Sequence, residues 1–405
     1  MIAKPSSIFS VRNNSIDIFR ALTMLLMIFV NDIWSVSGLP EWLGHAEWGQ
    51  DMLGLADIVF PCFLFVVGMS IPYAIESRFA KGIDATDTIG HILTRSLALL
   101  IMGVYIVNTE SGLSPESGMS FNLYRILMVA AFFLIWNVYP KTEKLYLKYT
   151  FSALKIAGLL LLLFLGIIFR DTNGGILSPR WWGILGIIGW TYLICAFIYL
   201  FTRDRLRYLI PILVFLIVIC ILQTPMKEGG SILNLPGDNF FNAMLNILHI
   251  NNGALPAFTM GGIILSLISA RYKGVTRLKR LLSAFVVAFL FIIAGYITNN
   301  YWIISKLGET PPWVFYCIGI GIFTYSIIYW LDSIGKTAWA KIIEPAGTAT
   351  LTCYLVPYIL YAIRFIESPE WFRNGFPGLM NCILFSFFTI GVTYLLGRIH
   401  IKLKI

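Results

Sequence analysis

The feature that most constrains the fold of this chain is a series of long apolar segments that recurs from end to end. A helix that crosses the hydrocarbon core of a bilayer needs about 20 predominantly apolar residues. Only 13% of the 405 residues are charged, against about 25% in soluble domains. The sequence therefore predicts an all-α, polytopic integral membrane helix bundle in which residues 1–405 form a single domain. Twelve segments are long and apolar enough to span: 15–35, 56–76, 89–108, 122–139, 151–169, 182–202, 207–223, 253–270, 279–298, 313–331, 347–365 and 377–396.

The distribution of Lys and Arg predicts the orientation and supports the shortest segment, 207–223. Cytoplasmic loops of membrane proteins carry an excess of Lys and Arg. The N-terminal tail, every second loop and the C-terminal tail each carry two to four of them. The first and third loops carry none, and the other intervening loops carry one or two. Twelve spans with both termini in the cytoplasm fit this alternation, whereas eleven spans, the alternative, would invert it downstream.

The remaining composition narrows the class of protein. The formal net charge of +9 is typical of cytoplasmic loops that face anionic lipid, and no nucleic-acid motif accompanies it. The six cysteines all fall within apolar runs without CxxC spacing, so we expect core side chains and neither disulfides nor a metal site. The polar first fifteen residues run into a full-length span, which predicts no cleavable signal peptide. The expected partner is the lipid bilayer and not nucleic acid.

Polar residues gather where the first two predicted spans meet the outer face. Asn31 lies near the outer end of the first span, the following loop carries His45, and the second span opens with Asp57. Because the first span ascends and the second descends, these three residues are expected at one level. Ionisable groups inside a membrane usually face the bundle interior and are functional by default. A carboxylate beside a histidine can fix its tautomer and raise its basicity.

Each of these residues also has a simpler interpretation. Asn31 could make an interhelical hydrogen bond, Asp57 could cap the second span, and His45 could be an ordinary loop histidine. At the cytoplasmic end of the first span, Asp17 and Arg20 are three residues apart and could form a local ion pair or contact a bound anion. The combination of His45, Asp57 and Asn31 nevertheless predicts a general base at the outer face.

A second group of residues is compatible with phosphate or sugar binding. Arg95, near the cytoplasmic end of the third span, could join Arg20 around a phosphate-rich ligand, although basic side chains there also snorkel to lipid headgroups. In the outer loops, the hypothesis of a sugar site rests on neutral hydrogen-bonding groups and on aromatic faces. The residues concerned are Trp48, His249, Asn251 and Asn252. The alternative for Trp48 is an aromatic belt, and the alternative for the segment of Asn251 and Asn252 is a turn with a helix cap.

Three stretches resemble a known family of membrane enzymes. "SIDIFRALTMLLMIFVND", "HAEW" and "ADIVFPCFLFVVGMSI", all within residues 15–76, are similar to the opening motif of the heparan-α-glucosaminide N-acetyltransferase family. Residues 313–365 resemble its bacterial NagX-like branch, which carries the domain called DUF5009. The chain departs from the family at Ala21, where glycine is usual, and in "INNGALPAF", which lacks the acids of the corresponding family motif. If those acids orient the acceptor sugar, this protein uses another acceptor or none.

The resemblance implies a transmembrane acetyltransferase of a bacterial inner membrane that moves an acetyl group from cytoplasmic acetyl-CoA to a periplasmic amino sugar or glycan. In this interpretation His45 deprotonates the acceptor or transiently carries the acetyl group, while Asp57 orients it and Asn31 hydrogen-bonds the thioester oxygen. The cofactor-binding residues would be Arg20, Arg95 and Asp17, and the acceptor-binding residues Trp48, His249, Asn251 and Asn252. A homodimer is plausible because the animal enzymes dimerise. The rival hypothesis is an inner-membrane amino-sugar transporter, since twelve spans are common among carriers.

Overall fold

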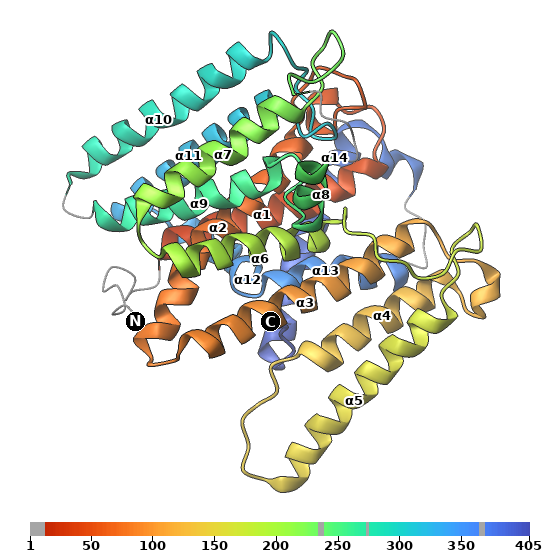
Figure 1. Ribbon diagram of the computed structural model, residues 1–405. Coiled ribbons are helices and arrows are strands. Elements are labelled where there is room, and N and C mark those ends of the chain that lie inside the picture. The colour runs from red at the N-terminus through yellow and green to blue at the C-terminus, as the bar shows by residue number, and fades with distance from the viewer. Residues whose placement is uncertain (1–12, 234–238, 273–274, 364–368) are drawn as a thin grey trace.

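The computed structural model describes residues 13–233, 239–272, 275–363 and 369–405. All secondary-structure elements in these ranges are helices. The only β contacts among the described residues are two isolated bridges, Ser37–Asn374 and Asn137–Leu403. The predicted all-α class is therefore confirmed. The helices run side by side in alternating directions, as Figure 1 shows.

Each of the twelve predicted spans overlaps a helix, including the weakly predicted 207–223, and residues 364–365 of the eleventh span lie outside the described residues. Nine of these helices are long and apolar enough to cross a membrane within the described ranges. Of the other three, α4 and α13 are shorter apolar helices of 16 and 14 residues, and α1 has 19 residues. The chain is thus a helical membrane protein, and twelve crossings with cytoplasmic termini stay a prediction. The helices are α1 (Asn14–Asp32), α2 (Leu55–Ala80), α3 (Ala85–Glu110), α4 (Phe121–Trp136), α5 (Leu145–Ile168), α6 (Ile184–Thr202), α7 (Leu206–Gln223), α9 (Ala254–Arg271), α10 (Arg277–Thr298), α11 (Pro311–Ser333), α13 (Thr350–Ile363) and α14 (Gly375–Arg398).

Two short helices were not predicted. α8 (Phe240–Ile247) precedes α9, and α12 (Glu344–Thr348) precedes α13. α8 lies at the end of the bundle that the sequence predicts to be the outer one, and that end is called the outer end below. α12 packs against α1, where Gly347 lies so close to the backbone of Asp17 that a Cβ there would come within 2.6 Å of the Asp17 carbonyl oxygen. Neither element shows a helical period in the sequence, because a segment of at most eight residues is too short to display one.

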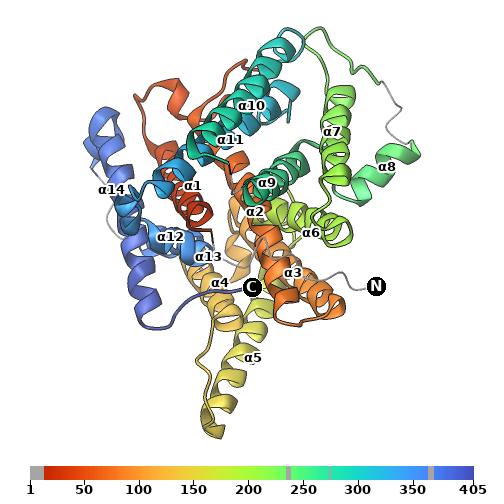
Figure 2. The same cartoon turned by 90° about the vertical axis from the view of Figure 1, so that its left-hand side faces the viewer.

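The centre of the bundle is the pair α2 and α9. At Gly68 an added Cβ would lie 1.9 Å from the carbonyl oxygen of Thr259, and at Gly262 it would lie 1.9 Å from that of Phe65. Small residues on both helices thus let the two backbones approach closely, as is common inside membranes where dispersion contacts drive helix packing. α1, α6 and α11 surround this pair, as the turned view in Figure 2 shows.

Two helices lie at the periphery. α5 packs mainly on α4, and α10 packs on α11. Most of their large apolar side chains, such as Leu160 and Phe289, are exposed. In a membrane protein such surfaces face lipid, because lipid tails are as apolar as the side chains.

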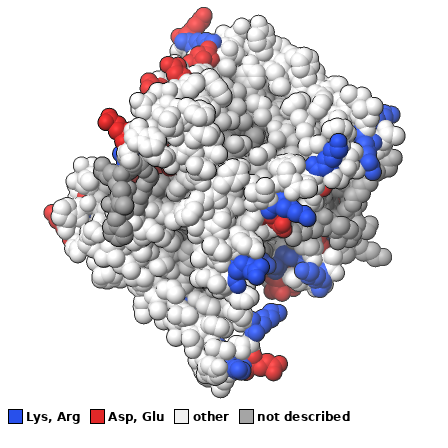
Figure 3. Space-filling view, turned by 180° about the vertical axis from the view of Figure 1, so that it is seen from behind, with Lys and Arg blue, Asp and Glu red and all other residues white. Residues whose placement is uncertain are grey.

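The charged side chains also separate by side of the molecule. In Figure 3 the Lys and Arg side chains gather along the lower right, Asp and Glu predominate along the upper left edge, and the surface between is largely uncharged. A wide uncharged belt is what a bilayer requires. The arrangement agrees with the alternation of basic loops along the sequence.

Candidate active site

His45 and Asp57 form a tight pair at the outer entrance to α2. His45 Nδ1 lies 2.7 Å from Asp57 Oδ1. Asp57 Oδ2 accepts hydrogen bonds from the backbone N–H groups of Ala46, at 2.9 Å, and Gly54, at 3.3 Å. Gly54 is the N-cap of α2 and Asp57 its third residue, so the carboxylate caps the helix and holds the histidine loop at the same time.

This pairing assigns different roles to the two imidazole nitrogens. With Nδ1–H donating to the nearly fully buried Asp57 carboxylate, Nε2 is the nitrogen that can accept a proton. The side chain of His45 keeps 35% exposure, so a ligand can reach it. Trp313 Nε1 donates to the Asp57 carbonyl oxygen at 2.9 Å, which fixes the first turn of α2 against α11. The simple interpretation of Asp57 as a cap and the functional one are therefore compatible.

Lys306 completes the charge arrangement, and sequence reasoning missed it. It lies in the loop between α10 and α11, with Nζ 3.4 Å from His45 Nδ1. Burial lowers the pKa of Lys306, and the nearby Asp57 carboxylate partly offsets this effect. Lys306 therefore places a cation beside the pair of His45 and Asp57. The available signal was a single lysine in an outer loop that otherwise lacks basic residues.

His45 faces a cavity of about 450 Å³ at the outer end of the bundle. Asn31, from the end of α1, lines the same cavity as His45, and His45 bonds to Asp57, so the three residues lie at one end of the bundle. The tyrosine hydroxyls of α13 add further polar groups. Tyr361 donates to the buried carboxylate of Asp32 at 2.7 Å, and Tyr354 and Tyr358 hydroxyls lie 3.3 Å apart. Glu110 and Arg125, from α3 and α4, complete the polar lining.

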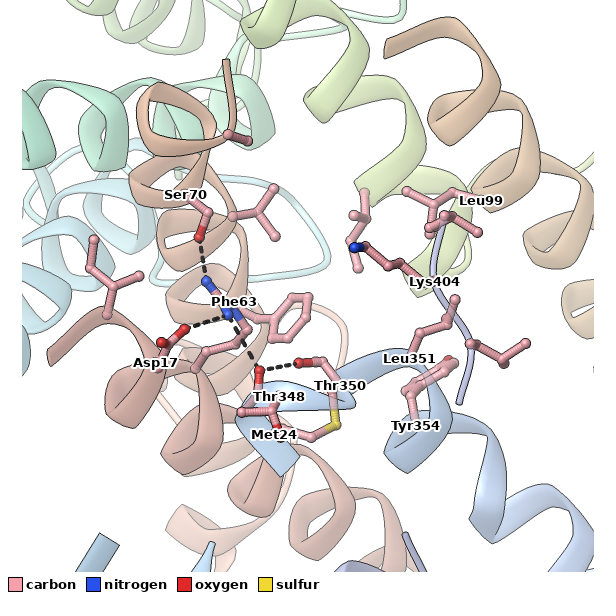
Figure 4. Close-up of a pocket in the computed structure, with 18 of the residues that line it drawn as sticks. Asp17, Met24, Phe63, Ser70, Leu99, Thr348, Thr350, Leu351, Tyr354 and Lys404 are labelled. Atoms are coloured by element: carbon pink, nitrogen blue, oxygen red, sulfur yellow. Dashed lines mark hydrogen bonds and ion pairs between the residues drawn. The ribbon is translucent and has the colours of Figure 1, made fainter. Parts of the chain in front are cut away.

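A second cavity, of about 430 Å³, lies toward the other end of α1 and is lined by Asp17, Arg20, Arg95 and Lys404. Arg20 is held firmly: Nη1 lies 2.9 Å from Asp17 Oδ1 and Nη2 donates to Ser70 Oγ at 2.7 Å. Figure 4 shows these bonds, with Lys404 on the wall opposite. The local ion pair of Asp17 and Arg20 and a position at a ligand cavity are thus both present.

Arg95 is held less completely than Arg20. Its guanidinium lies 4.6 Å from the centroid of the Tyr192 ring, and its Nε is buried without a hydrogen-bond partner. A buried unpartnered donor is costly, and an anionic ligand in this cavity would relieve that cost. Three cations, Arg20, Arg95 and Lys404, therefore line a space suited to phosphate groups.

The two cavities adjoin. Four residues line both of them: Met27, Ile184, Leu185 and Tyr354. Arg20 and Asn31 are eleven residues apart on α1, which corresponds to about 16 Å along the helix axis. The cations and His45 therefore line two neighbouring cavities at different levels along α1.

Comparison with known families now adds to this geometry. A family model described as "Domain of unknown function (DUF5009)" matches residues 12–242, more than half of the chain. The chain belongs to the DUF5009 family. Among curated proteins, human and mouse heparan-alpha-glucosaminide N-acetyltransferase are each 37% identical to it over 107 residues. That match covers 26% of this chain and 15% of the length of either relative.

The structure places the remaining predicted residues of this DUF5009 protein away from the His45 cavity. Trp48 is 78% exposed on the first outer loop. His249, at a positive φ of 51°, stacks on Trp190 with ring centroids 3.8 Å apart. Asn251 and Asn252 line a separate outer cleft. Asn252 also accepts from Ala254 N at 3.1 Å, so it caps α9, as the alternative interpretation had it.

The six cysteines and the buried acid Glu76 of the DUF5009 chain lie inside the bundle. All six cysteines are buried as free thiols. Glu76, buried in α2, accepts from Tyr199 at 3.0 Å and pairs with Arg203 at 2.8 Å. No group of three or more His, Cys, Asp or Glu with a metal-binding arrangement occurs among the described residues.

Proposed function

We propose that this protein transfers an acetyl group across a bacterial inner membrane, from cytoplasmic acetyl-CoA to the amine or hydroxyl of an amino sugar or glycan on the periplasmic side. The observation that carries the proposal is the pair of adjoining cavities, one lined by Arg20, Arg95 and Lys404 and the other by His45. The human and mouse relatives are named as N-acetyltransferases of heparan-alpha-glucosaminide, and this name supports the choice of the acetyl group and the amino sugar.

The proposed orientation of acetyl-CoA follows from the chemistry of the two cavities. Its phosphates would lie at Arg20, Arg95 and Lys404, because guanidinium and ammonium groups form charge-assisted hydrogen bonds with phosphate. Its pantetheine arm would follow the shared wall at Met27 and Leu185 toward the outer cavity. The thioester would then lie beside His45, which is where the acceptor arrives.

In the proposed chemistry, His45 Nε2 takes a proton from the acceptor amine as the nitrogen attacks the thioester carbonyl. The carbon–sulfur bond breaks, and the CoA thiolate leaves toward the cytoplasm. Asn31 would donate a hydrogen bond to the carbonyl oxygen as negative charge develops there. Asp57 keeps the imidazole oriented and stabilises the imidazolium. A route through acetyl-His45 would use the same residues.

The first test measures sidedness and the role of His45 together. Inverted membrane vesicles that contain the protein are loaded with glucosamine, and radiolabelled acetyl-CoA is added outside. We expect labelled N-acetylglucosamine inside the vesicles for the wild type and for His400→Ala, and none for His45→Ala. Calorimetric titration of the purified proteins should give micromolar acetyl-CoA binding in all three, because His45 does not line the cavity of Arg20, Arg95 and Lys404 that is proposed to bind the phosphates.

Two outcomes would contradict the proposal. If the wild type did not bind acetyl-CoA, the proposed transferase activity would be wrong. If His45→Ala kept full activity, the proposed role of His45 as the general base would be wrong. The shared passage would also suit an amino-sugar carrier, the second candidate. Uptake of labelled glucosamine into vesicles without acetyl-CoA would favour that carrier.

A further inference from the structure

The outer cavity contains two charged side chains that acetyl transfer does not require. Glu110 is the last residue of α3, and Arg125 lies in the second turn of α4. Both line the cavity that holds His45 and Asn31. Within the described ranges, no hydrogen bond or ion pair joins Glu110 to Arg125.

Arg125 is poorly satisfied by the protein. Its Nε is buried without a hydrogen-bond partner. Its guanidinium instead lies over two aromatic rings, 4.6 Å from the centroid of Phe121 and 5.8 Å from that of Tyr358. These contacts fix the plane of the guanidinium but satisfy none of its N–H groups. A guanidinium presents a planar fork of donors that matches a carboxylate or a phosphate.

Glu110 presents the opposite charge to the same space. It is exposed to solvent where it borders the cavity. The loop between α3 and α4 contains the short 3-10 turn Pro115–Ser117, and it joins the two helices without bringing the carboxylate onto the guanidinium. A carboxylate and a guanidinium that line one cavity without a hydrogen bond or ion pair between them are suited to a ligand that carries both a positive and a negative group.

We propose that the acceptor is an amino sugar that also carries an acidic group. Its carboxylate or phosphate binds Arg125, and its ammonium binds near Glu110. After the ammonium has lost one proton to solvent, the neutral amine lies within reach of His45, which takes a second proton as the nitrogen attacks the thioester. This inference rests on the proposed acetyl transfer for its chemistry, but the binding that it describes can be measured without catalysis. Arg125 and Glu110 are then specificity residues that hold the acceptor.

The test compares three acceptors that share the glucosamine ring. Glucosamine has no acid, glucosamine 6-phosphate has a phosphate, and muramic acid has a carboxylate. Dissociation constants are measured on the purified full-length protein without acetyl-CoA. We expect at least one acidic sugar to bind about tenfold more tightly than glucosamine, and its identity distinguishes phosphate from carboxylate.

Variants then assign the preference to its residues. In Arg125→Gln, the ratio of the dissociation constant of glucosamine to that of the acidic sugar should fall to about one. Arg373→Gln, at an exposed outer position away from the cavity, should retain the wild-type ratio. Glu110→Gln should weaken all three amino sugars alike and leave their order unchanged. Acetyl-CoA binding, measured on each variant, checks that the fold is intact.

The outcomes separate the two proposals. Equal binding of the three sugars by the wild type, or an acid preference that survives Arg125→Gln, would overturn this inference alone. If the acidic sugar binds as expected and no acetyl group is transferred to it or to glucosamine, the acetyl-transfer proposal fails and the acceptor site stands.

Discussion

Two outer segments of this protein each carry a histidine near asparagine or aspartate residues, but the surroundings of the two histidines differ. The first outer loop places a histidine, His45, between an asparagine and an aspartate, and the turn before α9 places His249 just before Asn251 and Asn252. In the first, the imidazole bonds to a buried carboxylate and faces a cavity. In the second, the imidazole stacks on Trp190, and Asn252 caps α9. Residue type alone therefore did not distinguish a histidine that faces a cavity from one that packs on an aromatic ring.

The largest expected effect tests that comparison directly. His45→Asn should reduce acetyl transfer by about 10³-fold, because a positioned base contributes roughly 10²–10⁴-fold to the rate. His249→Asn should change the rate by less than about twofold, and asparagine tolerates the positive φ at that position. Initial rates with saturating acetyl-CoA measure both. Equal losses in the two variants would remove the distinction between the segments.

A second pair of variants compares the two helix caps. Asp57→Asn can still cap α2 but cannot stabilise an imidazolium, so we expect the rate to fall about 100-fold while acetyl-CoA binding persists. Asn252→Ala should lower stability by about 1 kcal/mol through the lost cap of α9 and leave the rate nearly unchanged. Rates and thermal unfolding in detergent are measured together. A large rate loss in Asn252→Ala would place the second segment in the active site.

Glu309 offers a pH test of the structural segment, because its carbonyl oxygen accepts a bond from Asn252 Nδ2 at 3.0 Å. Burial raises the pKa of Glu309 to about 7. The folded state therefore holds a proton that the unfolded state releases near pH 4.5, so stability falls as pH rises from about 4.5 to 7. Glu309→Gln should stabilise the protein by roughly 2 kcal/mol at pH 8 and little at pH 4. Unfolding temperatures at both pH values measure this, and a pH-independent effect would contradict it.

The smallest expected effect concerns Lys306. Lys306→Met removes a cation 3.4 Å from His45 Nδ1. A nearby cation opposes the positive charge that develops on the imidazole as it takes a proton from the acceptor, so we expect the rate of acetyl transfer at pH 8 to rise about threefold in this variant. Lys227→Met, whose cation pairs with Asp51, is the matched control and should leave the rate unchanged. An equal or lower rate in Lys306→Met would mean that Lys306 does not act through charge.

The sequence alone determined where most of the helices lie along the chain and that His45, Asp57 and Asn31 lie at one level. A bilayer fixes the length of an apolar helix, and consecutive spans run in opposite directions, so residues that flank one loop must lie at one level. Those constraints are local in the chain. They explain why each of the twelve predicted segments overlaps a helix and why His45 and Asp57 lie side by side.

Only the tertiary structure decided which distant residues join that loop. Lys306, Glu110 and Arg125 come from three other parts of the chain and look like ordinary loop or helix-end charges in the sequence. The same holds for Lys404, which reaches the cavity of Arg20 and Arg95 from the end of the chain. Helix order around α2 and α9 depends on close packing of small side chains, which has no sequence period of its own. The physical reason is that membrane insertion sets each helix separately, whereas side-chain packing sets their neighbours.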